Sequence, residues 1–247
     1  MKKLLCLLLC AASVSVFGQG STLYKVNVVK PKAGMKSAFE ASWKMHLDKF
    51  HKTSDKRNVS EVISGNGSGE YVIVEGPISY ADMDKTLPAA KEHSLDLEKN
   101  FSPKLEVTGT NAIYRWADTL SYHADVIADL HLTSVTVLKD GKAGEYFTEL
   151  RRAALIYEKM KLPISFNIMI KQQAGSSPTI VGIRNLKDGY KELETGYFKM
   201  VGPDDFKNAY IADYGQEAWD KRVKLLVDDV VSREQFFEKN RADLSSK

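Results

Sequence analysis

Cysteine is almost absent from this chain, and its two cysteines, Cys6 and Cys10, both lie within the first ten residues. This segment has the features of a cleavable signal peptide, so we expect the mature protein to contain no cysteine. A chain without cysteine has no disulfide, no thiolate nucleophile and no cysteine-ligated metal. The remaining chain is nevertheless long enough to bury a hydrophobic core without cross-links.

The predicted signal peptide covers residues 1–18 and has its features in the order that export requires. Lys2 and Lys3 supply the positive charge, residues 4–17 form the apolar stretch, and the small residue Gly18 ends the segment. A membrane-spanning helix needs about 20 apolar residues, and this stretch has only about 14. We therefore expect a periplasmic or secreted protein with no membrane span after cleavage.

A strong charge of either sign is also lacking. The formal charge is +3, and loss of Lys2 and Lys3 with the signal peptide would reduce it to +1. Such a chain has no electrostatic basis for binding nucleic acid.

Motifs that identify a reaction are missing as well. The sequence has no Gly-x-Ser-x-Gly elbow and no phosphate-binding loop. Its five histidines lack the spacing of a metal site, so we predict no bound metal. Whether the chain is an enzyme is left open.

An internal repeat organises the chain. The sequence Lys-Ala-Gly at residues 32–34 recurs at residues 142–144, each time after a short β-like run and before a helical pattern. Residues 71–75 align with residues 179–183 at nearly the same offset. The predicted units are the signal peptide (1–18), a first repeat (19–122) and a second repeat (123–247) with a helical insertion near 204–216.

Hydrophobic periodicity predicts the order β-α-β-β-α-β in both repeats. In the first repeat we expect strands at 24–30, 59–63, 70–74 and 111–116, and helices from about 36 and from 81 to 99. In the second we expect strands at 132–138, 166–170, 179–184 and 233–238, a helix at 145–160, and a last helix with Trp219, Val223, Leu226 and Val230 on one face.

Two β-α-β-β-α-β units in one chain resemble the dimeric α+β barrel superfamily, in which ferredoxin-like units pair their sheets into one barrel. The Lys-Ala-Gly turn before an amphipathic helix resembles the monooxygenase-like and NIPSNAP-like members. The resemblance implies an α+β fold of two tandem ferredoxin-like repeats packed as a dimeric α+β barrel. It bears on fold more than on function, because one fold carries many unrelated sites.

The resemblance also implies a ligand cavity between sheet and helices. The superfamily includes cofactor-independent oxygenases, haem-degrading enzymes and binding proteins without catalysis. Its haem-degrading branch uses an Asn on the first strand, and a Trp and then a His on the second helix. Asn27 and His93 stand at similar places here, but Met83 stands where the Trp is expected. We therefore expect no cofactor, with haem as the alternative.

Other residues are candidates for the same cavity. His46 shares a helical face with Trp43 and could bind a ligand or act as a base, although a core histidine is the simpler interpretation. His51 lies near the helix end, where a cation suits the carbonyl terminus. Arg151 is either a polar contact for the ligand or a solvated helix residue. The predicted ligand-binding residues are Asn27, Trp43, His46, Met83, His93, Trp116 and Arg151, with no catalytic residue assigned.

Two functions are compatible with these patterns. The first is an exported, non-catalytic protein that holds a small, flat, apolar ligand or associates with itself. The second is a monooxygenase-like enzyme acting on a haem or quinone-like substrate. The lack of a convergent acid, base or nucleophile set favours the first. The oligomeric state is left open, because pairing between the two repeats of one chain either replaces a dimer or leaves a sheet edge at which two chains pair.

Overall fold

The structure is a computed structural model that describes residues 22–51, 56–85, 89–106, 110–123, 125–172, 177–194 and 203–246. The signal peptide and its cleavage site lie outside the described residues, so export stays a prediction. Within the described ranges, no helix combines the length and apolar character needed to cross a membrane.

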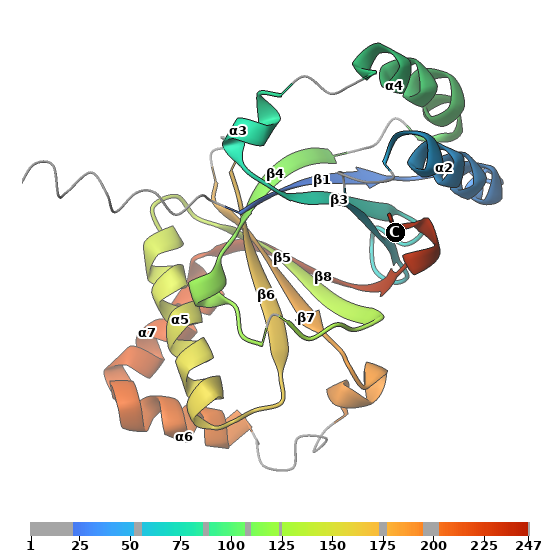
Figure 1. Cartoon of the computed structure of the whole chain (residues 1–247). Coiled ribbons are helices and arrows are strands. Elements are labelled where there is room, and N and C mark those ends of the chain that lie inside the picture. Colours follow the sequence, from blue (N-terminus) through green and yellow to red (C-terminus); the bar gives the residue numbers. More distant parts are fainter. Residues whose placement is uncertain are drawn as a thin grey trace, which may run out of the picture.

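Eight strands form the centre of the molecule. They are β1 (Leu23–Val29), β2 (Arg57–Val62), β3 (Tyr71–Ile78), β4 (Thr110–Trp116), β5 (Leu130–Leu138), β6 (Ser165–Lys171), β7 (Thr179–Asn185) and β8 (Val230–Asn240). They close into one barrel in the order β1-β3-β2-β8-β5-β7-β6-β4, and every neighbouring pair is antiparallel (Figure 1). The predicted α+β barrel fold is therefore confirmed.

Each half of the chain contributes four neighbouring strands in the same relative order. These are β4-β1-β3-β2 from the first half and β8-β5-β7-β6 from the second. Two seams join the halves: β2 pairs with β8, where Ser60 faces Asn240, and β4 pairs with β6, where Trp116 faces Met169. Each described strand has a neighbour on both sides, although the β2–β8 pairing spans only Ser60–Val62 and Glu238–Asn240.

Helices cover the outside of the barrel in two groups. They are α2 (Lys36–Phe50), α3 (Tyr80–Met83), α4 (Ala90–Asp96) with a π-helical turn (Leu97–Phe101), α5 (Ala143–Lys159), α6 (Pro203–Tyr214) and α7 (Gln216–Asp228). Figure 1 shows α2 and α4 on one side of the barrel, and α5, α6 and α7 on the opposite side. A short 3-10 turn, Ala242–Leu244, follows β8.

The space between sheet and helices is filled by side chains. Phe39, Trp43 and Leu47 recur at the spacing of one helical face on α2, and all three are buried. They pack with residues of β2 and β3 and with Leu244 from the C-terminal turn. The corresponding cluster in the second half comprises Ala117, Leu120, Leu138, Tyr146, Ile168, Ile170, Ile180 and Leu225.

Two predicted helices differ from those observed. The helix expected over 81–99 is wrong as one element, because α3 begins at a capping box formed by Ser79 and Asp82 and α4 begins only at Ala90. Proline at position 88 cannot donate a helical hydrogen bond, which is consistent with this break. On α7 the predicted stripe is correct only in part: Leu226 and Val230 pack against the second core, but Val223 is 44% exposed and Leu225 is buried instead. The preceding helix α6 sets this orientation, with Tyr210 5.6 Å from the Trp219 ring.

The C-terminal turn should contribute strongly to stability. Leu244 is fully buried, so Leu244→Ala should lower the free energy of unfolding by about 2–5 kcal/mol. The matched control Leu155→Ala removes the same atoms from a side chain that is 47% exposed, and should change it by less than about 0.5 kcal/mol. Urea denaturation measures both, and equal losses would contradict the assigned packing.

An ion cluster holds the same segment in place and should make stability depend on pH. Arg241 Nη1 lies 2.7 Å from carboxylate oxygens of both Glu40 and Glu61. The hydrogen bond from Arg241 lowers the pKa of Glu40 below its ordinary value of 4.5. A carboxyl group whose pKa is lower in the folded state than in the unfolded state stabilises the protein at pH values above its unfolded-state pKa. This stabilisation is lost as the pH falls through the folded-state pKa.

We therefore expect Glu40→Gln to destabilise the protein at pH 7, with the difference from wild type shrinking as the pH falls below 4.5. Urea titrations between pH 7 and pH 3 measure this difference. In an Arg241→Met background the pH dependence of the Glu40→Gln effect should become smaller. A stability difference between Glu40→Gln and wild type that grows toward acid pH would contradict the ion pair between Arg241 and Glu40.

Candidate functional site

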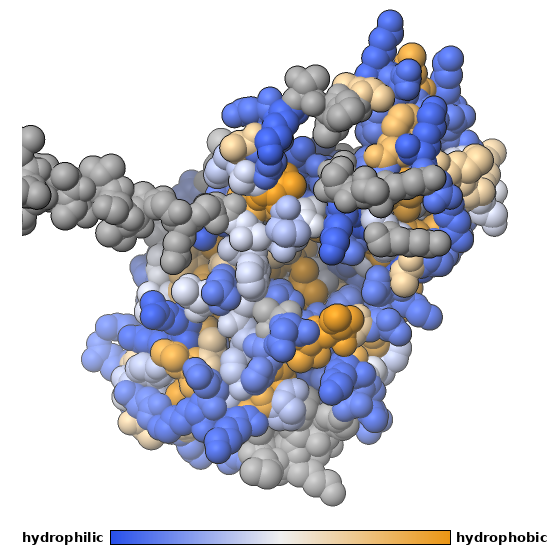
Figure 2. Space-filling view, viewed as in Figure 1, coloured by the Kyte–Doolittle hydropathy of each residue, from blue (hydrophilic) through white to orange (hydrophobic). Residues whose placement is uncertain are grey.

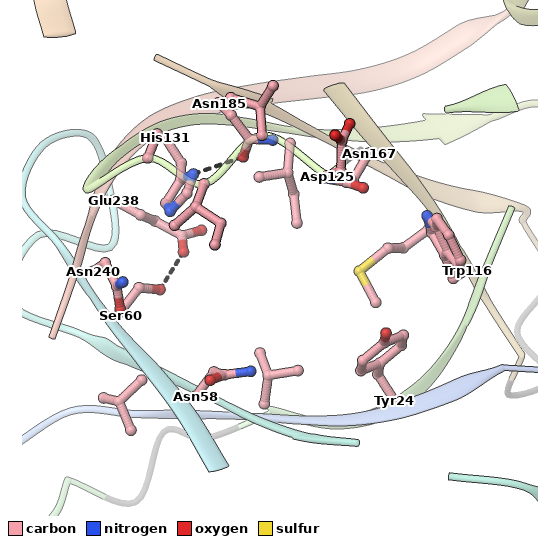
Figure 3. Close-up of a pocket in the computed structure, with 17 residues that line it drawn as sticks. Tyr24, Asn58, Ser60, Trp116, Asp125, His131, Asn167, Asn185, Glu238 and Asn240 are labelled. Carbon is pink, nitrogen blue, oxygen red and sulfur yellow. Dashed lines mark hydrogen bonds between the residues drawn. The ribbon is translucent and has the colours of Figure 1, made fainter. Parts of the chain in front are cut away.

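A solvent-open cavity of about 550 Å³ lies inside the barrel. Side chains of a strand point alternately to its two faces, so every second residue reaches the barrel interior. Asn58 on β2, for example, lines the cavity and is exposed, while its neighbour Val59 belongs to the packed core. The lining side chains named in Figure 3 are Tyr24, Asn58, Ser60, Trp116, Asp125, His131, Asn167, Asn185, Glu238 and Asn240.

The cavity has an aromatic end and a polar end. Figure 3 shows Tyr24 and Trp116 on one side, facing His131 and Glu238 across the hollow. Trp116 donates its indole N–H to Ser121 Oγ at 3.1 Å, which fixes the ring. Burial raises the pKa of Tyr24, so its hydroxyl keeps its proton at neutral pH.

A hydrogen-bond chain orients His131 at the polar end. Ser165 donates to the carbonyl oxygen of His123 at 2.6 Å and accepts from Asn185 Nδ2 at 2.8 Å. Because Asn185 Nδ2 is the donor to Ser165, Asn185 Oδ1 is the acceptor that faces His131, and it accepts a hydrogen bond from His131 Nδ1 at 2.9 Å. This assigns the proton to Nδ1 and leaves a lone pair on Nε2 of the neutral ring. His131 is thus an oriented acceptor or base.

The remaining polar groups define what the cavity can hold. Ser60 donates to the buried carboxylate of Glu238, and Asp125 supplies a second carboxyl group, while the described lining has no lysine or arginine. Among the residues that the structure describes, the side-chain amides of Asn58, Asn167 and Asn240 have no hydrogen-bond partner. These amides are available to a ligand.

A second cluster of polar side chains lies on the outside of the barrel, between α2 and α4. We call His46, His51 and His93 the histidine cluster. Their Nε2 atoms lie 3.2 Å apart in all three pairs. His46 Nδ1 lies 2.7 Å from Asp96 Oδ2, and Trp43 stacks on the His46 ring at a centroid distance of 5.6 Å.

Burial governs the protonation of His46 in this cluster. Only 2% of the His46 surface is exposed, and this desolvation lowers its pKa, although the hydrogen bond to Asp96 acts in the opposite direction. The same hydrogen bond lowers the pKa of Asp96, which therefore stays ionised at neutral pH. A neutral His46 paired with a carboxylate is the form in which histidine binds metals.

The predicted site residues fall into separate places. His46, His93 and Trp43 meet at the histidine cluster, although Trp43 donates its indole N–H to the Leu244 carbonyl at 2.7 Å and is part of the core. Trp116 alone of the predicted residues lines the barrel cavity. The cavity thus lies inside the barrel and not between sheet and helices, where the resemblance implied it.

The other three predicted residues are in neither place. Asn27 is two positions from Val29, which packs against the first core, so it faces the helices and not the cavity. Met83 belongs to α3, which Figure 1 shows apart from α4, the helix that carries His93. Arg151 is exposed on α5, while the neighbouring Arg152 forms the ion pair, 2.7 Å from Glu149.

Sequence reasoning missed most of the cavity lining and the role of His51. Alternating polar residues on β2 and β8 were the available signal, with Asn58 and Ser60 on one strand and Glu238 and Asn240 on the other. For His51 no comparable signal exists, because its partner His93 lies 42 positions away on another helix.

Haem does not fit the histidine cluster. An axial haem ligand must direct a ring nitrogen at the iron, with the porphyrin plane in front of it. The Nε2 atoms of His46 and His93 face each other at 3.2 Å, so a porphyrin has no room between them.

Comparison with known proteins identifies the fold and nothing finer. No family model matches the sequence, and neither does any curated protein. An anthrone oxidase-like protein matches with a TM-score of 0.58 and 9% identity over 90% of this chain and 92% of that one. A candidate monooxygenase from Lactobacillus acidophilus matches with a TM-score of 0.53 and 10% identity over 92% and 96%.

Chlorite dismutase from Candidatus Nitrospira defluvii, crystallised with imidazole, also matches, with a TM-score of 0.51 and 4% identity over 93% of this chain and 95% of that one. Identities this low establish a common fold and no common activity. These neighbours are dimeric α+β barrel proteins of the monooxygenase-like and chlorite dismutase-like groups. The chain therefore has the barrel fold that these groups share.

Proposed function

We propose that this protein binds a small, uncharged or cationic molecule inside the barrel, with an apolar ring at one end and hydrogen-bonding groups at the other. The observation that carries the proposal is the two-ended cavity, with Tyr24 and Trp116 facing His131 and Glu238. Binding pockets typically combine apolar walls with a few fixed polar groups in this way. The predicted signal peptide would place this binding in the periplasm or outside the cell.

The charge of the lining selects the ligand. Two carboxyl groups and no lysine or arginine favour a neutral or positively charged molecule over an anion. The amides of Asn58, Asn167 and Asn240 supply both donors and acceptors, which suits hydroxyl or amino substituents. The ligand is therefore more polar than the flat, apolar molecule expected from the sequence.

A second candidate function is a monooxygenase-like enzyme that acts on a hydroxylated ring. The specific observation in its favour is His131, whose Nδ1 is held by Asn185 so that Nε2 can remove a proton from a ligand hydroxyl. One structural neighbour is described as anthrone oxidase-like, which makes anthrone a suitable probe. Tandem ferredoxin-like repeats and a NIPSNAP-like relationship remain compatible with the shared strand order of the two halves.

Ligand charge provides the first test of binding. Tyramine and hydroquinone carry a phenol ring with a cationic or neutral substituent, whereas 4-hydroxybenzoate carries an anionic one. We expect the first two to raise the melting temperature and quench Trp116 fluorescence at concentrations where the third does neither. Preferential binding of 4-hydroxybenzoate would reject the proposed ligand class.

A pair of matched variants locates the site. Asn167→Leu removes a cavity amide and should weaken tyramine binding roughly fivefold, the value of about one hydrogen bond. Asn27→Leu makes the same change on the helix-facing side of β1 and should leave tyramine binding unchanged. Isothermal titration calorimetry measures both. Equal effects, or an effect of Asn27→Leu alone, would place the ligand elsewhere.

An oxygen electrode tests the enzymatic alternative. If His131 is the base, the protein should accelerate oxygen consumption with anthrone in air, and His131→Gln should abolish the acceleration while tyramine still binds. No acceleration by the wild-type protein would leave the binding function as the better account.

A further inference from the structure

The histidine cluster is not explained by packing alone. Each Nε2 atom either carries a hydrogen or presents a lone pair, so among three such atoms at least two are alike. Two like atoms 3.2 Å apart repel each other, whether they are two N–H groups or two lone pairs. At most two of the three contacts can therefore be hydrogen bonds, in a place where His46 and His51 are almost fully buried.

A metal ion would satisfy all three nitrogens at once. Zinc binds histidine nitrogens at about 2.0–2.1 Å in a tetrahedral arrangement, which separates neighbouring ligand nitrogens by about 3.3–3.4 Å. The observed separations of 3.2 Å agree with this value in each of the three pairs. The equal distances are informative, because ordinary packing of three imidazoles does not require them.

The surroundings of His46 also match those of a metal ligand. Its Nδ1 lies 2.7 Å from Asp96 Oδ2, and Asp96 Oδ1 in turn accepts a hydrogen bond from Asn100 at 2.8 Å. A carboxylate that accepts from one ring nitrogen directs the lone pair of the other nitrogen toward the ion. Trp43 and Phe101 enclose the ring with apolar surface.

We propose that His46, His51 and His93 bind one divalent transition-metal ion through their Nε2 atoms, with zinc(II) as the ion that best matches the ligand set. Three uncharged imidazoles suit zinc and its neighbours cobalt(II), nickel(II) and copper(II) better than magnesium or calcium, which prefer oxygen ligands. Three protein ligands leave the fourth tetrahedral position for water or a small molecule.

The site has a route from solvent and a consequence for the fold. A hollow of about 480 Å³ borders His51 and carries Asp48 on its wall, where Asp243 is already paired with Lys44 and Arg241. The ligands come from two elements, because His46 and His51 lie at the end of α2 and His93 lies on α4. A bound ion therefore joins α4, whose seven residues include no buried side chain, to the packed core.

Cobalt(II) binding tests the proposal directly. The full chain is purified without a polyhistidine tag, stripped with a chelator and titrated with cobalt(II) and then with zinc(II). We expect one equivalent of cobalt to give the intense visible absorption of tetrahedral coordination, and one equivalent of zinc to displace it. Zinc should also raise the melting temperature.

Three variants separate this site from adventitious binding. His93→Gln should weaken zinc binding at least 100-fold, and Asp96→Asn, which keeps an acceptor for His46, should weaken it by about 10–100-fold. His131→Gln removes a histidine from the barrel cavity and should bind zinc like the wild type. Far-UV circular dichroism without metal checks that each variant folds, and Asp96→Asn keeps the test decisive if His93→Gln does not.

Several results would overturn the metal site. These are no stoichiometric binding of cobalt or zinc by the folded wild-type protein, octahedral cobalt spectra, or zinc affinity unchanged in both His93→Gln and Asp96→Asn. A loss of affinity in His131→Gln equal to that in His93→Gln would also reject it. A failure of metal binding at the histidine cluster would leave the proposed ligand binding untouched, because the cavity lies on the other face of the sheet.

Discussion

The structure depends on barrel closure by β8. This strand pairs with β5 along most of its length and with β2 at its end, so it joins the two halves of the chain. Part of the polar end of the cavity depends on this seam, because Ser60 on β2 bonds to Glu238 on β8. The residues after β8 also join the C-terminus to the first half of the chain. Leu244 lies in the first hydrophobic core, and Arg241 is paired with Glu40 and Glu61.

One sheet carries two sites on its opposite faces. In the first half, inward-facing residues such as Asn58 line the cavity, and outward-facing residues such as Val59 pack beneath α2. The histidine cluster lies beyond this packed layer, where α2 ends and α4 crosses it. A hydrophobic layer therefore separates the cluster from the cavity, which is why each can be altered without the other.

The sequence predicted the strands well because their signals are local. The alternating apolar runs and the glycine-rich hairpin identified β2 and β3, and the helical stripe of Phe39 and Trp43 identified the buried face of α2. Local patterns could not show which polar strand face becomes the inside of a barrel. Asn58 and Ser60 would be ordinary solvent-facing residues on an open sheet, and only closure by β8 turns them toward a cavity.

The histidine cluster lay beyond prediction for a different reason. His46 and His51 are five positions apart, which on a continuous helix would place them on different sides, but His51 is the C-terminal cap of α2 and departs from helical geometry. His93 lies on α4, which begins at Ala90, whereas the sequence predicted one continuous helix over 81–99. The expectation of no metal ligand set was based on spacing, and spacing does not report contacts between helices.

The position of β8 also determines when the fold can form during synthesis. As the chain grows, β2 and β5 are complete long before their common partner has been made, and both then present unpaired edges. The barrel can close only after β8 has left the ribosome, so the nascent protein passes through a stage that needs protection from aggregation. A ribosome stalled before β8 has emerged would hold the molecule in this open-edged state.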